Sequence, residues 1–352
     1  MYTVDYLLTK AQEMGGSDLH LTVGVPPKAR LVGELKDVDT DKLLPNDMRE
    51  LVYSILPKGQ VDRFEETGEL DFSYSIPRVG RYRVNAYHQR GSYAMVIRLV
   101  GESIPSAEKL GIPESVMDLI HKRRGLVLVT GPTGSGKSTT LASMIDAINQ
   151  QFAFNIITLE DPVEYLHPHK RSIVNQREIG VDTKSFGSAL TAAMREDPDV
   201  ILVGEMRDLD TISTAITAAE TGHLVFSTLH TIGAASTIDR IIDVFPPYQQ
   251  GQIRSQLSLV IEGVVSQQLI PMIGGKGRKA AFEVMLGTPA IRNLIREGKT
   301  HQISGIMQTS KKQGMKTMDD AIFELYVNRY IDREQAIGYA QDPMALNARM
   351  FI

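Results

Sequence analysis

Residues 125–138 read GLVLVTGPTGSGKS, and this stretch decides the fold. It places the pattern GxxxxGK followed by Ser between an apolar run and the helix-forming residues TTLASMIDAI. A glycine-rich loop that joins a buried strand to a helix in this way binds the phosphates of nucleotides. A chance match is expected only about once in a hundred chains of this length and average composition. The stretch therefore predicts a phosphate-binding loop, or P-loop.

Each residue type in the P-loop has a purpose in binding phosphate. Its glycines let the backbone fold around an anion, so that N–H groups and the positive end of the next helix point inward. Lys137 would place a positive charge at the β- and γ-phosphates of ATP, and the Ser138 hydroxyl would bind Mg²⁺. The predicted nucleotide-binding residues of the loop are Gly131, Pro132, Thr133, Gly134, Ser135, Gly136, Lys137, Ser138 and Thr139.

Length and composition limit what the rest of the chain does. The 352 residues suffice for two or three domains, and 42% hydrophobic with 23% charged residues is ordinary for a globular protein. The net charge of -4 gives no support for a nucleic-acid partner. The absence of cysteine excludes disulfides and cysteine-ligated metals. We see no signal peptide and no apolar run of about 20 residues, so we expect a cytoplasmic protein without direct membrane insertion.

The first hundred residues predict a small α+β domain. A helix is expected at 4–14, and runs of alternating polarity predict half-buried antiparallel strands. Glycines and prolines within 101–113 predict a linker. The expected strands are 19–23, 28–32, 70–76, 81–88 and 93–99, with two helices at about 46–56 and 58–66.

The remainder, 114–352, predicts an α/β domain. Continuous apolar runs separated by helices are typical of a parallel sheet that is covered on both faces. The C-terminal region, from about 270 to 352, is expected to be helical, and the residues after Pro343 to be less ordered. The expected strands are 126–130, 156–160, 200–204 and 224–229, and the expected later helices are 247–268, 289–297, 317–328 and 333–340.

Two of these strands end in acids. Residues 156–164 read IITLEDPVE, and residues 200–208 read VILVGEMRD. In such sheets ligands gather at the carboxyl ends of the strands, where acids hold Mg²⁺ or orient a water molecule. For Glu205, the pattern leaves open a direct bond to Mg²⁺, a bond through water, or polarisation of the attacking water. Glu160, Asp161 and Glu164 form an acidic cluster that is either catalytic or simply solvated.

A third strand ends in a histidine. Residues 221–231 read TGHLVFSTLHT, which places His230 at the carboxyl end, where a γ-phosphate would lie. A histidine there could sense the phosphate and transmit its loss. His223, at the other end of the strand, is equally compatible with a structural role. Arg240, further along the chain, is a weaker candidate for the nucleotide site.

Four segments have now been described: the P-loop, 156–164, 200–208 and 221–231. Taken in this order, they resemble the motifs of the secretion ATPases of type II secretion and type IV pili. The segments SDLHL and GRYRV are similar to the PAS-like domain of that family, so the resemblance covers essentially the whole chain. It implies a RecA-like P-loop ATPase domain, an N-terminal PAS-like domain, ATP with Mg²⁺, and a homohexamer. It also implies that Glu164 activates water and that Glu205 is the Walker B acid.

The resemblance further implies that arginines of a neighbouring subunit complete the site. The candidates in the N-terminal domain are Arg83, Arg90 and Arg98, on or beside two adjacent predicted strands. Arginines supplied by a partner stabilise charge in the transition state of phosphoryl transfer. Ordinary surface salt bridges would explain the same residues.

The resemblance also indicates whether the ATPase would retract or assemble pili. Residues 290–303, AIRNLIREGKTHQI, are similar to a signature of the retraction ATPases, the PilT group of twitching motility. The assembly ATPases usually carry a tetracysteine module, which is missing here. The resemblance therefore implies pilus retraction through an inner-membrane platform protein and the rest of the pilus machinery. An assembly ATPase, a RecA-class nucleic-acid translocase and a small-molecule phosphotransferase remain alternatives.

Overall fold

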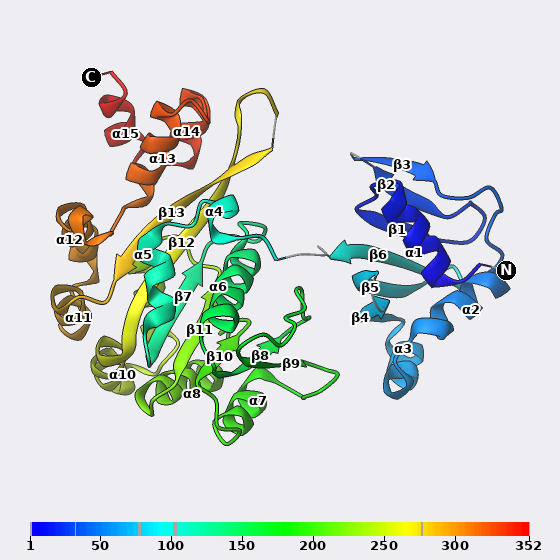
Figure 1. Ribbon diagram of the computed structural model, residues 1–352, viewed down its shortest axis with the longest axis horizontal. Helices are drawn as coiled ribbons and strands as arrows, with labels where there is room; N and C mark the ends of the chain where they lie inside the picture. The colour runs from blue at the N-terminus through cyan, green and yellow to red at the C-terminus, as the bar shows by residue number, and fades with distance from the viewer. Residues whose placement is uncertain (1, 32, 77–78, 101–103, 276, 352) are drawn as a thin grey trace. The chain divides into compact units, whose positions relative to one another are not determined.

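The computed structural model describes residues 2–31, 33–76, 79–100, 104–275 and 277–351 (Figure 1). It divides the chain into two compact units. Unit 1 comprises Met1–Ser103 with Pro162–Leu166, and unit 2 comprises Ile104–Asp161 with His167–Ile352. Residues 104–113, which we predicted as linker, therefore belong to unit 2, and the rest of that predicted linker lies outside the described residues.

Unit 1 has the predicted α+β architecture, with one antiparallel sheet in the order β3-β2-β1-β6-β5-β4. Sequence analysis missed β3, because all four of its residues are exposed and the edge strand shows no alternation of polarity. The elements of unit 1 are α1 (Val4–Glu13), β1 (Asp18–Leu21), β2 (Lys28–Leu31), β3 (Glu34–Asp37), α2 (Pro45–Ile55), η1 (Lys58–Gln60), α3 (Val61–Thr67), β4 (Glu69–Ile76), β5 (Gly80–Gln89) and β6 (Ser92–Val100).

The two faces of this sheet differ in character. Leu19, Phe72, Val84 and Ile97 are buried in one core cluster together with apolar residues of α1 and α2. Side chains alternate between the faces of a strand, so the residues between these positions lie on the opposite face. That opposite face carries most of the charged residues of the central strands.

Unit 2 is built on a sheet in the order β13-β12-β7-β11-β10-β8-β9, parallel except for β13. Its strands are β7 (Gly125–Thr130), β8 (Asn155–Glu160), β9 (Ile173–Glu178), β10 (Val200–Val203), β11 (Leu224–Leu229), β12 (Ile261–Pro271) and β13 (Arg278–Leu286). Its helices are α4 (Ala107–Leu110), α5 (Glu114–Met117), η2 (Asp118–His121), α6 (Lys137–Gln151), α7 (Phe186–Ala193), α8 (Leu209–Glu220), α9 (Ala234–Asp243), α10 (Pro247–Val260), η3 (Ile273–Gly275), α11 (Pro289–Arg296), η4 (Thr300–Gln302), α12 (Ile303–Thr309), η5 (Lys311–Gln313), α13 (Met318–Val327), α14 (Arg333–Tyr339) and α15 (Pro343–Arg349).

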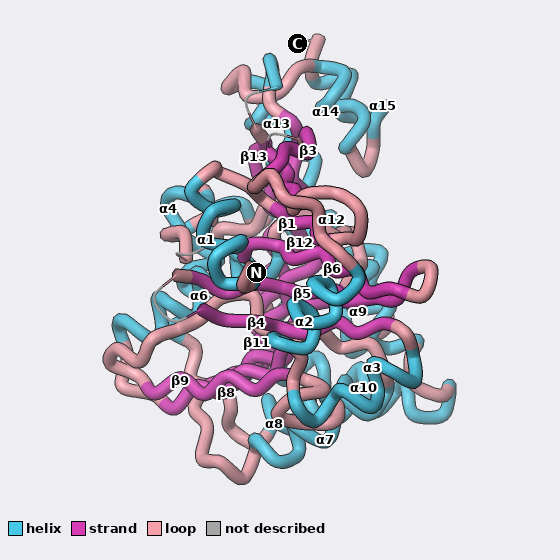
Figure 2. Tube along the Cα trace, turned by 90° about the vertical axis from the view of Figure 1, so that its right-hand side faces the viewer, coloured by secondary structure: helices cyan, strands magenta, loops and turns pink. Residues whose placement is uncertain are grey.

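The central strand β7 is covered on both faces, as its apolar sequence predicts. Leu126 and Leu128 lie in a core cluster with residues of α7 to α12. Val127 and Val129 lie in a second cluster with residues of α5 and α6. Figures 1 and 2 show helices on both sides of this sheet. Burial on both faces leaves only the ends of the strands open to a ligand.

Three predictions about the second half of the chain were wrong. The helix predicted at 247–268 ends at Val260, and the apolar residues that follow form β12 against β7. The residues of β12 mix apolar with polar side chains without strict alternation, so periodicity did not identify them as a strand. The region from about 270 is not wholly helical, because β13 pairs with β12. After Pro343 the chain forms α15, whose first turn is capped by Asp342. The polar edge strand β9 was missed as well.

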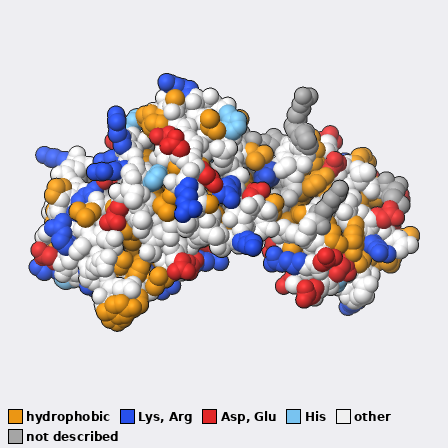
Figure 3. Space-filling view, turned by 90° about the horizontal axis from the view of Figure 1, so that it is seen from below, with side chains coloured by type: hydrophobic (Ala, Val, Ile, Leu, Met, Phe, Trp, Pro, Cys, Tyr) orange, Lys and Arg blue, Asp and Glu red, His pale blue; other side chains and the backbone are white. Residues whose placement is uncertain are grey.

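One face of the molecule carries charges of both signs. On the face shown in Figure 3, Lys and Arg side chains are interspersed with Asp and Glu side chains. Within the part of the chain that the structure describes, every helix is too short or too polar to span a bilayer.

His167 gives unit 2 a dependence on pH that experiment can detect. Its side chain is 8% exposed, and burial lowers the pKa of the imidazole from 6.5 to about 4. The folded chain therefore resists protonation that the unfolded chain accepts, so stability is lost as the pH falls from 6.5 towards 4. Between pH 6.5 and pH 5 we expect a loss of about 2 kcal/mol.

Thermal unfolding of wild type and His167→Phe at pH 7 and pH 5 tests this prediction. The unfolding temperature should fall less on acidification in His167→Phe, which has no imidazole to protonate. His301→Phe, at an exposed histidine, is the control and should behave like wild type. Equal acid sensitivity of all three proteins would contradict the prediction.

Candidate nucleotide-binding site

The P-loop connects the end of β7 to the start of α6 and depends on three glycines. Gly131, Gly134 and Gly136 have φ angles of 139°, 77° and 89°, which side chains of L-residues rarely allow. Gly136 also precedes the first residue of α6. The loop therefore has the backbone that the sequence predicts, with the positive end of a helix directly behind it.

Gln267 of β12 backs the loop, and sequence analysis missed it. A methyl group at Gly131 would lie 2.2 Å from the Gln267 carbonyl oxygen, and one at Gly136 would lie 2.9 Å from its Nε2. The Gln267 Oε1 accepts a hydrogen bond of 2.8 Å from the Thr140 hydroxyl. Three points of the loop and its helix thus rest on one buried residue. Only a correct assignment of β12 as a strand could have identified it.

The polar groups inside the loop fit a bound phosphate. Lys137 is 8% exposed, and its Nζ donates to the carbonyl oxygens of Gly131 at 2.8 Å and Pro132 at 3.1 Å. The hydroxyls of Thr130 and Ser135 are buried and have no hydrogen-bond partner in the described part of the chain. Buried hydroxyls without partners are costly, so a phosphate that accepts from them would relieve that cost. Ser138 is exposed at the first turn of α6.

Glu205 and His230 meet at the carboxyl ends of neighbouring strands. The Glu205 Oε2 lies 3.5 Å from the His230 Nε2 and 2.7 Å from the Arg207 Nε. The segment around Glu205 is held on both sides, since Gly204 N–H donates to Leu159 O of β8 and Met206 N–H donates to Thr228 O of β11. The structure therefore brings these two predicted site residues together. His230 follows β11, which is paired with β7, and Glu205 follows β10, the next strand in the sheet.

The acidic cluster of Glu160, Asp161 and Glu164 is divided between the two units. In unit 2 the Glu160 Oε1 accepts from Thr158 Oγ1 at 2.6 Å and from Gln176 Nε2 at 3.0 Å, which anchors it beside β9. Glu164 lies in the segment Pro162–Leu166 of unit 1. Nothing in the sequence pattern signalled this division.

That short segment is fixed to the sheet of unit 1. The Arg81 Nε donates to the Val163 carbonyl oxygen at 2.8 Å, and the Val163 side chain is buried. Arg81 lies on β5 two residues before Arg83. The backbone next to Glu164 is therefore held by β5 of unit 1, through Arg81.

Two further sequence candidates, Arg240 and His223, lie on or next to helices of unit 2. Arg240 is exposed in the last turn of α9, and no contact described for this chain joins it to the P-loop. The His223 Nδ1 lies 2.9 Å from the Ala218 carbonyl oxygen, which ties the start of β11 to α8. This polar contact of His223 joins two elements of the fold.

The three predicted arginines occupy two places in unit 1. Arg83 of β5 and Arg98 of β6 lie directly opposite one another, on the face of the sheet away from the core cluster. Like charges in this position repel one another unless an anion lies between them. Arg90 lies in the turn between the two strands, with a φ of 49°. The sheet pairing thus singles out Arg83 and Arg98 as a matched pair.

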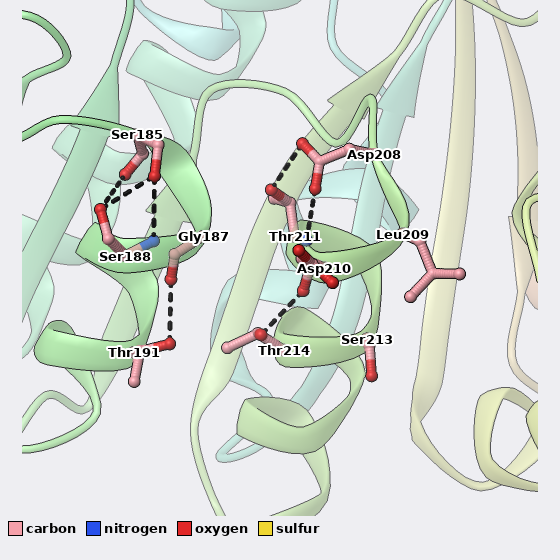
Figure 4. Close-up of a pocket in the computed structure, with 10 residues that line it drawn as sticks. All are labelled: Ser185, Gly187, Ser188, Thr191, Asp208, Leu209, Asp210, Thr211, Ser213 and Thr214. Atoms are coloured by element: carbon pink, nitrogen blue, oxygen red, sulfur yellow. Dashed lines mark hydrogen bonds between the residues drawn. The ribbon is translucent and has the colours of Figure 1, made fainter.

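An open pocket of about 720 Å³ lies elsewhere in unit 2, at the first turns of α7 and α8 (Figure 4). Its lining consists mainly of hydroxyl side chains and two acids. Several of these groups are already used, since the Asp208 carboxylate accepts from the backbone and side chain of Thr211 and Ser185 caps α7. No P-loop residue lines the pocket, so it is not the nucleotide site.

The metal chemistry of the site follows from its scarcity of protein ligands. Among the residues that the structure describes, no group of three or more His, Asp or Glu could hold a metal ion. Mg²⁺ in nucleotide sites is commonly held by one or two protein groups together with phosphates and water. The exposed Ser138 and the partly buried Glu205 fit that pattern.

A P-loop after an inner strand of a mainly parallel sheet, with a histidine and an acid at the ends of the next two strands, defines a P-loop ATPase of the RecA-like class. The family model described as "Type II/IV secretion system protein" matches residues 81–335. The chain belongs to this family of ATP-hydrolysing proteins.

Individual relatives cover nearly the whole chain. The type IV pilus retractation ATPase PilT of Pseudomonas aeruginosa is 49% identical over 96% of this chain and 98% of its own length. The twitching motility protein of Neisseria gonorrhoeae is 45% identical over 91% and 86%. The crystal structure of the pilus retraction motor PilT with bound ADP has a TM-score of 0.93 at 50% identity, covering 99% of this chain and 100% of that one. The fold is therefore that of a retraction ATPase.

The packing of Gly131 against β12 predicts that this glycine is indispensable. In Gly131→Ala the new methyl group meets the Gln267 carbonyl, so we expect ADP affinity to fall by at least about 100-fold. Gly134→Ala is the control, because a methyl group there has no atom within 4 Å. It suffers only backbone strain, which corresponds to a loss of about 5- to 30-fold. Calorimetric titration with ADP measures both, and equal affinities would show that β12 does not shape the loop.

Proposed function

We propose that this chain is the subunit of a motor that couples ATP hydrolysis to the retraction of type IV pili. The observation that carries the proposal is the P-loop with Lys137, set beside the Glu205–His230 pair, in a chain that matches a retraction ATPase almost end to end. The protein would work in the cytoplasm, attached to the inner membrane through a platform protein and the rest of the pilus machinery.

The chemistry we propose is in-line attack of water on the γ-phosphate of ATP. The loop N–H groups and the Lys137 ammonium bind the phosphates, and Ser138 holds Mg²⁺ together with Glu205, directly or through water. Mg²⁺ supplies charge neutralisation when it is bound. Glu164 activates the attacking water, and His230 reports on the γ-phosphate through its contact with Glu205.

We further propose that the working form is a homohexamer in which each site is completed by a second copy. The open face of unit 1 offers Arg83 and Arg98 to a nucleotide bound by a neighbouring subunit. In other phosphoryl-transfer enzymes, an arginine supplied by a partner raises the rate by about 10³- to 10⁵-fold. A like-charged pair on an exposed sheet face suits such an anionic partner.

The alternatives make different predictions for simple assays. A nucleic-acid translocase would show ATPase stimulation by DNA that is lost at high salt, but the net charge of -4 gives it no support. A small-molecule phosphotransferase would remain monomeric in light scattering with ATP. An assembly ATPase of pili or of type II secretion is opposed by the absence of cysteine and by the segment 290–303.

Lys137→Ala tests the chemistry. Removal of the ammonium takes away the charge that binds the β- and γ-phosphates, so we expect phosphate release to fall by at least about 100-fold. The assay is ATP hydrolysis by the purified chain, with thermal unfolding to show that the variant is folded. Full activity of a folded Lys137→Ala would exclude the proposed mechanism.

Deletion of the gene tests the direction of the motor. A strain that lacks a retraction motor should carry excess surface pili and should not twitch, because assembly continues unopposed. Electron microscopy and a twitching assay give the two readouts. Complementation with wild type should restore both, and complementation with Lys137→Ala should restore neither. A deletion strain without pili would identify an assembly motor instead.

A further inference from the structure

Asp18, in the segment SDLHL, is a carboxylate in the middle of a row of arginines. On β1 it lies directly opposite Arg98 of β6 on one side and Arg30 of β2 on the other. Arg83 of β5 lies opposite Arg98 in turn. Directly opposed residues of an antiparallel sheet point to the same face. One negative charge thus lies among three positive charges on the face away from the core.

The Asp18 carboxylate is buried, and each of its two oxygens accepts a hydrogen bond. The residue is 7% exposed, its Oδ1 accepts from the Arg98 Nε at 2.8 Å, and its Oδ2 accepts from the Ser17 hydroxyl at 2.7 Å. Burial acts to raise the pKa of this carboxyl, but the bonds from Arg98 and Ser17 outweigh it and leave the pKa below its usual value. Asp18 is therefore ionised at neutral pH and held in one orientation.

The bond orients Arg98 without using it up. The Arg98 side chain is 69% exposed, in contrast to the carboxylate that holds it. A guanidinium has five N–H groups, and the bond to Asp18 is made by the Nε. Among the residues that the structure describes, no bond is given for its two terminal nitrogens, whose N–H groups can therefore serve a further partner. Two such groups in one plane match two oxygens of a phosphate.

We propose that Asp18 is a positioning residue, which holds Arg98 in the orientation that contacts the phosphates of a nucleotide bound by a second copy of this chain. The inference rests on the proposed function, because it assumes that an arginine of this face completes the site of a neighbour. It also selects Arg98 among the three candidates. Arg90 lies in a turn, and the sheet offers Arg83 a like charge opposite it in place of an acid.

The test is a double-mutant cycle on the full chain, assembled with ATP. Asp18→Asn, Arg98→Ala and the double variant are compared for kcat and KM of ATP hydrolysis. We expect Asp18→Asn to lower kcat by about 10- to 100-fold with KM changed less than about twofold, since misplacement of a catalytic group affects mainly the transition state. The double variant should equal Arg98→Ala alone, because the two residues act as one unit.

Asp37→Asn is the matched control. Asp37 also pairs with a cation on this sheet, Lys28, but at an exposed edge strand, so its kcat should stay at the wild-type value. If Asp18→Asn does not fold, Ser17→Ala takes its place. It removes the second bond to the carboxylate from an exposed serine and should lower kcat by about two- to fivefold, again without a change in KM.

Three results would overturn the inference. Asp18→Asn could match Asp37→Asn in kcat, the losses from Asp18 and Arg98 could multiply independently, or Arg98→Ala could keep full activity. None of these results would contradict the proposed ATPase and retraction function, which the Lys137→Ala and deletion experiments test separately. Loss of the proposed function would instead appear there, with Lys137→Ala still active or the deletion strain without pili.

Discussion

The contact between the P-loop and β12 is the constraint on which the rest of unit 2 depends. The backbone of Gly131 passes so close to the Gln267 carbonyl that no side chain fits between them, and the Gln267 amide also holds α6 through Thr140. This contact fixes the loop on one side while β11 and β10 bring His230 and Glu205 to the other. A strand outside the P-loop motif thus sets the shape of the loop.

Local patterns predicted those parts of the fold whose signals are local. The P-loop and the strands β7, β8, β10 and β11 could be predicted because each combines an unbroken apolar run with a turn or a motif. The edge strands β3 and β9 could not, since exposed or polar residues give them no alternation. The strand β12 could not either, because polar residues such as Glu262, Ser266 and Gln268 interrupt its apolar ones and leave no regular alternation.

The site residues show the same limit. Lys137, Glu205 and His230 each follow a strand and could be found one by one. The pairing of Asp18 with Arg98 joins residues 80 positions apart, and only the register of β1 against β6 brings them together. Gln267 was missed for the same reason, because its importance comes from a neighbour in space. Site residues that follow a single strand could be predicted from the sequence. Contacts that depend on the order and register of strands in the sheet could not.

The short segment Pro162–Leu166 means that neither unit is a single stretch of chain. A fragment that begins at residue 104 would retain this segment but would lack Arg81, the donor to its Val163 carbonyl. Dissection of the protein at its apparent domain boundary would therefore disturb the loop that carries Glu164. An isolated ATPase unit is a poor substitute for the full chain, even for measurements of hydrolysis.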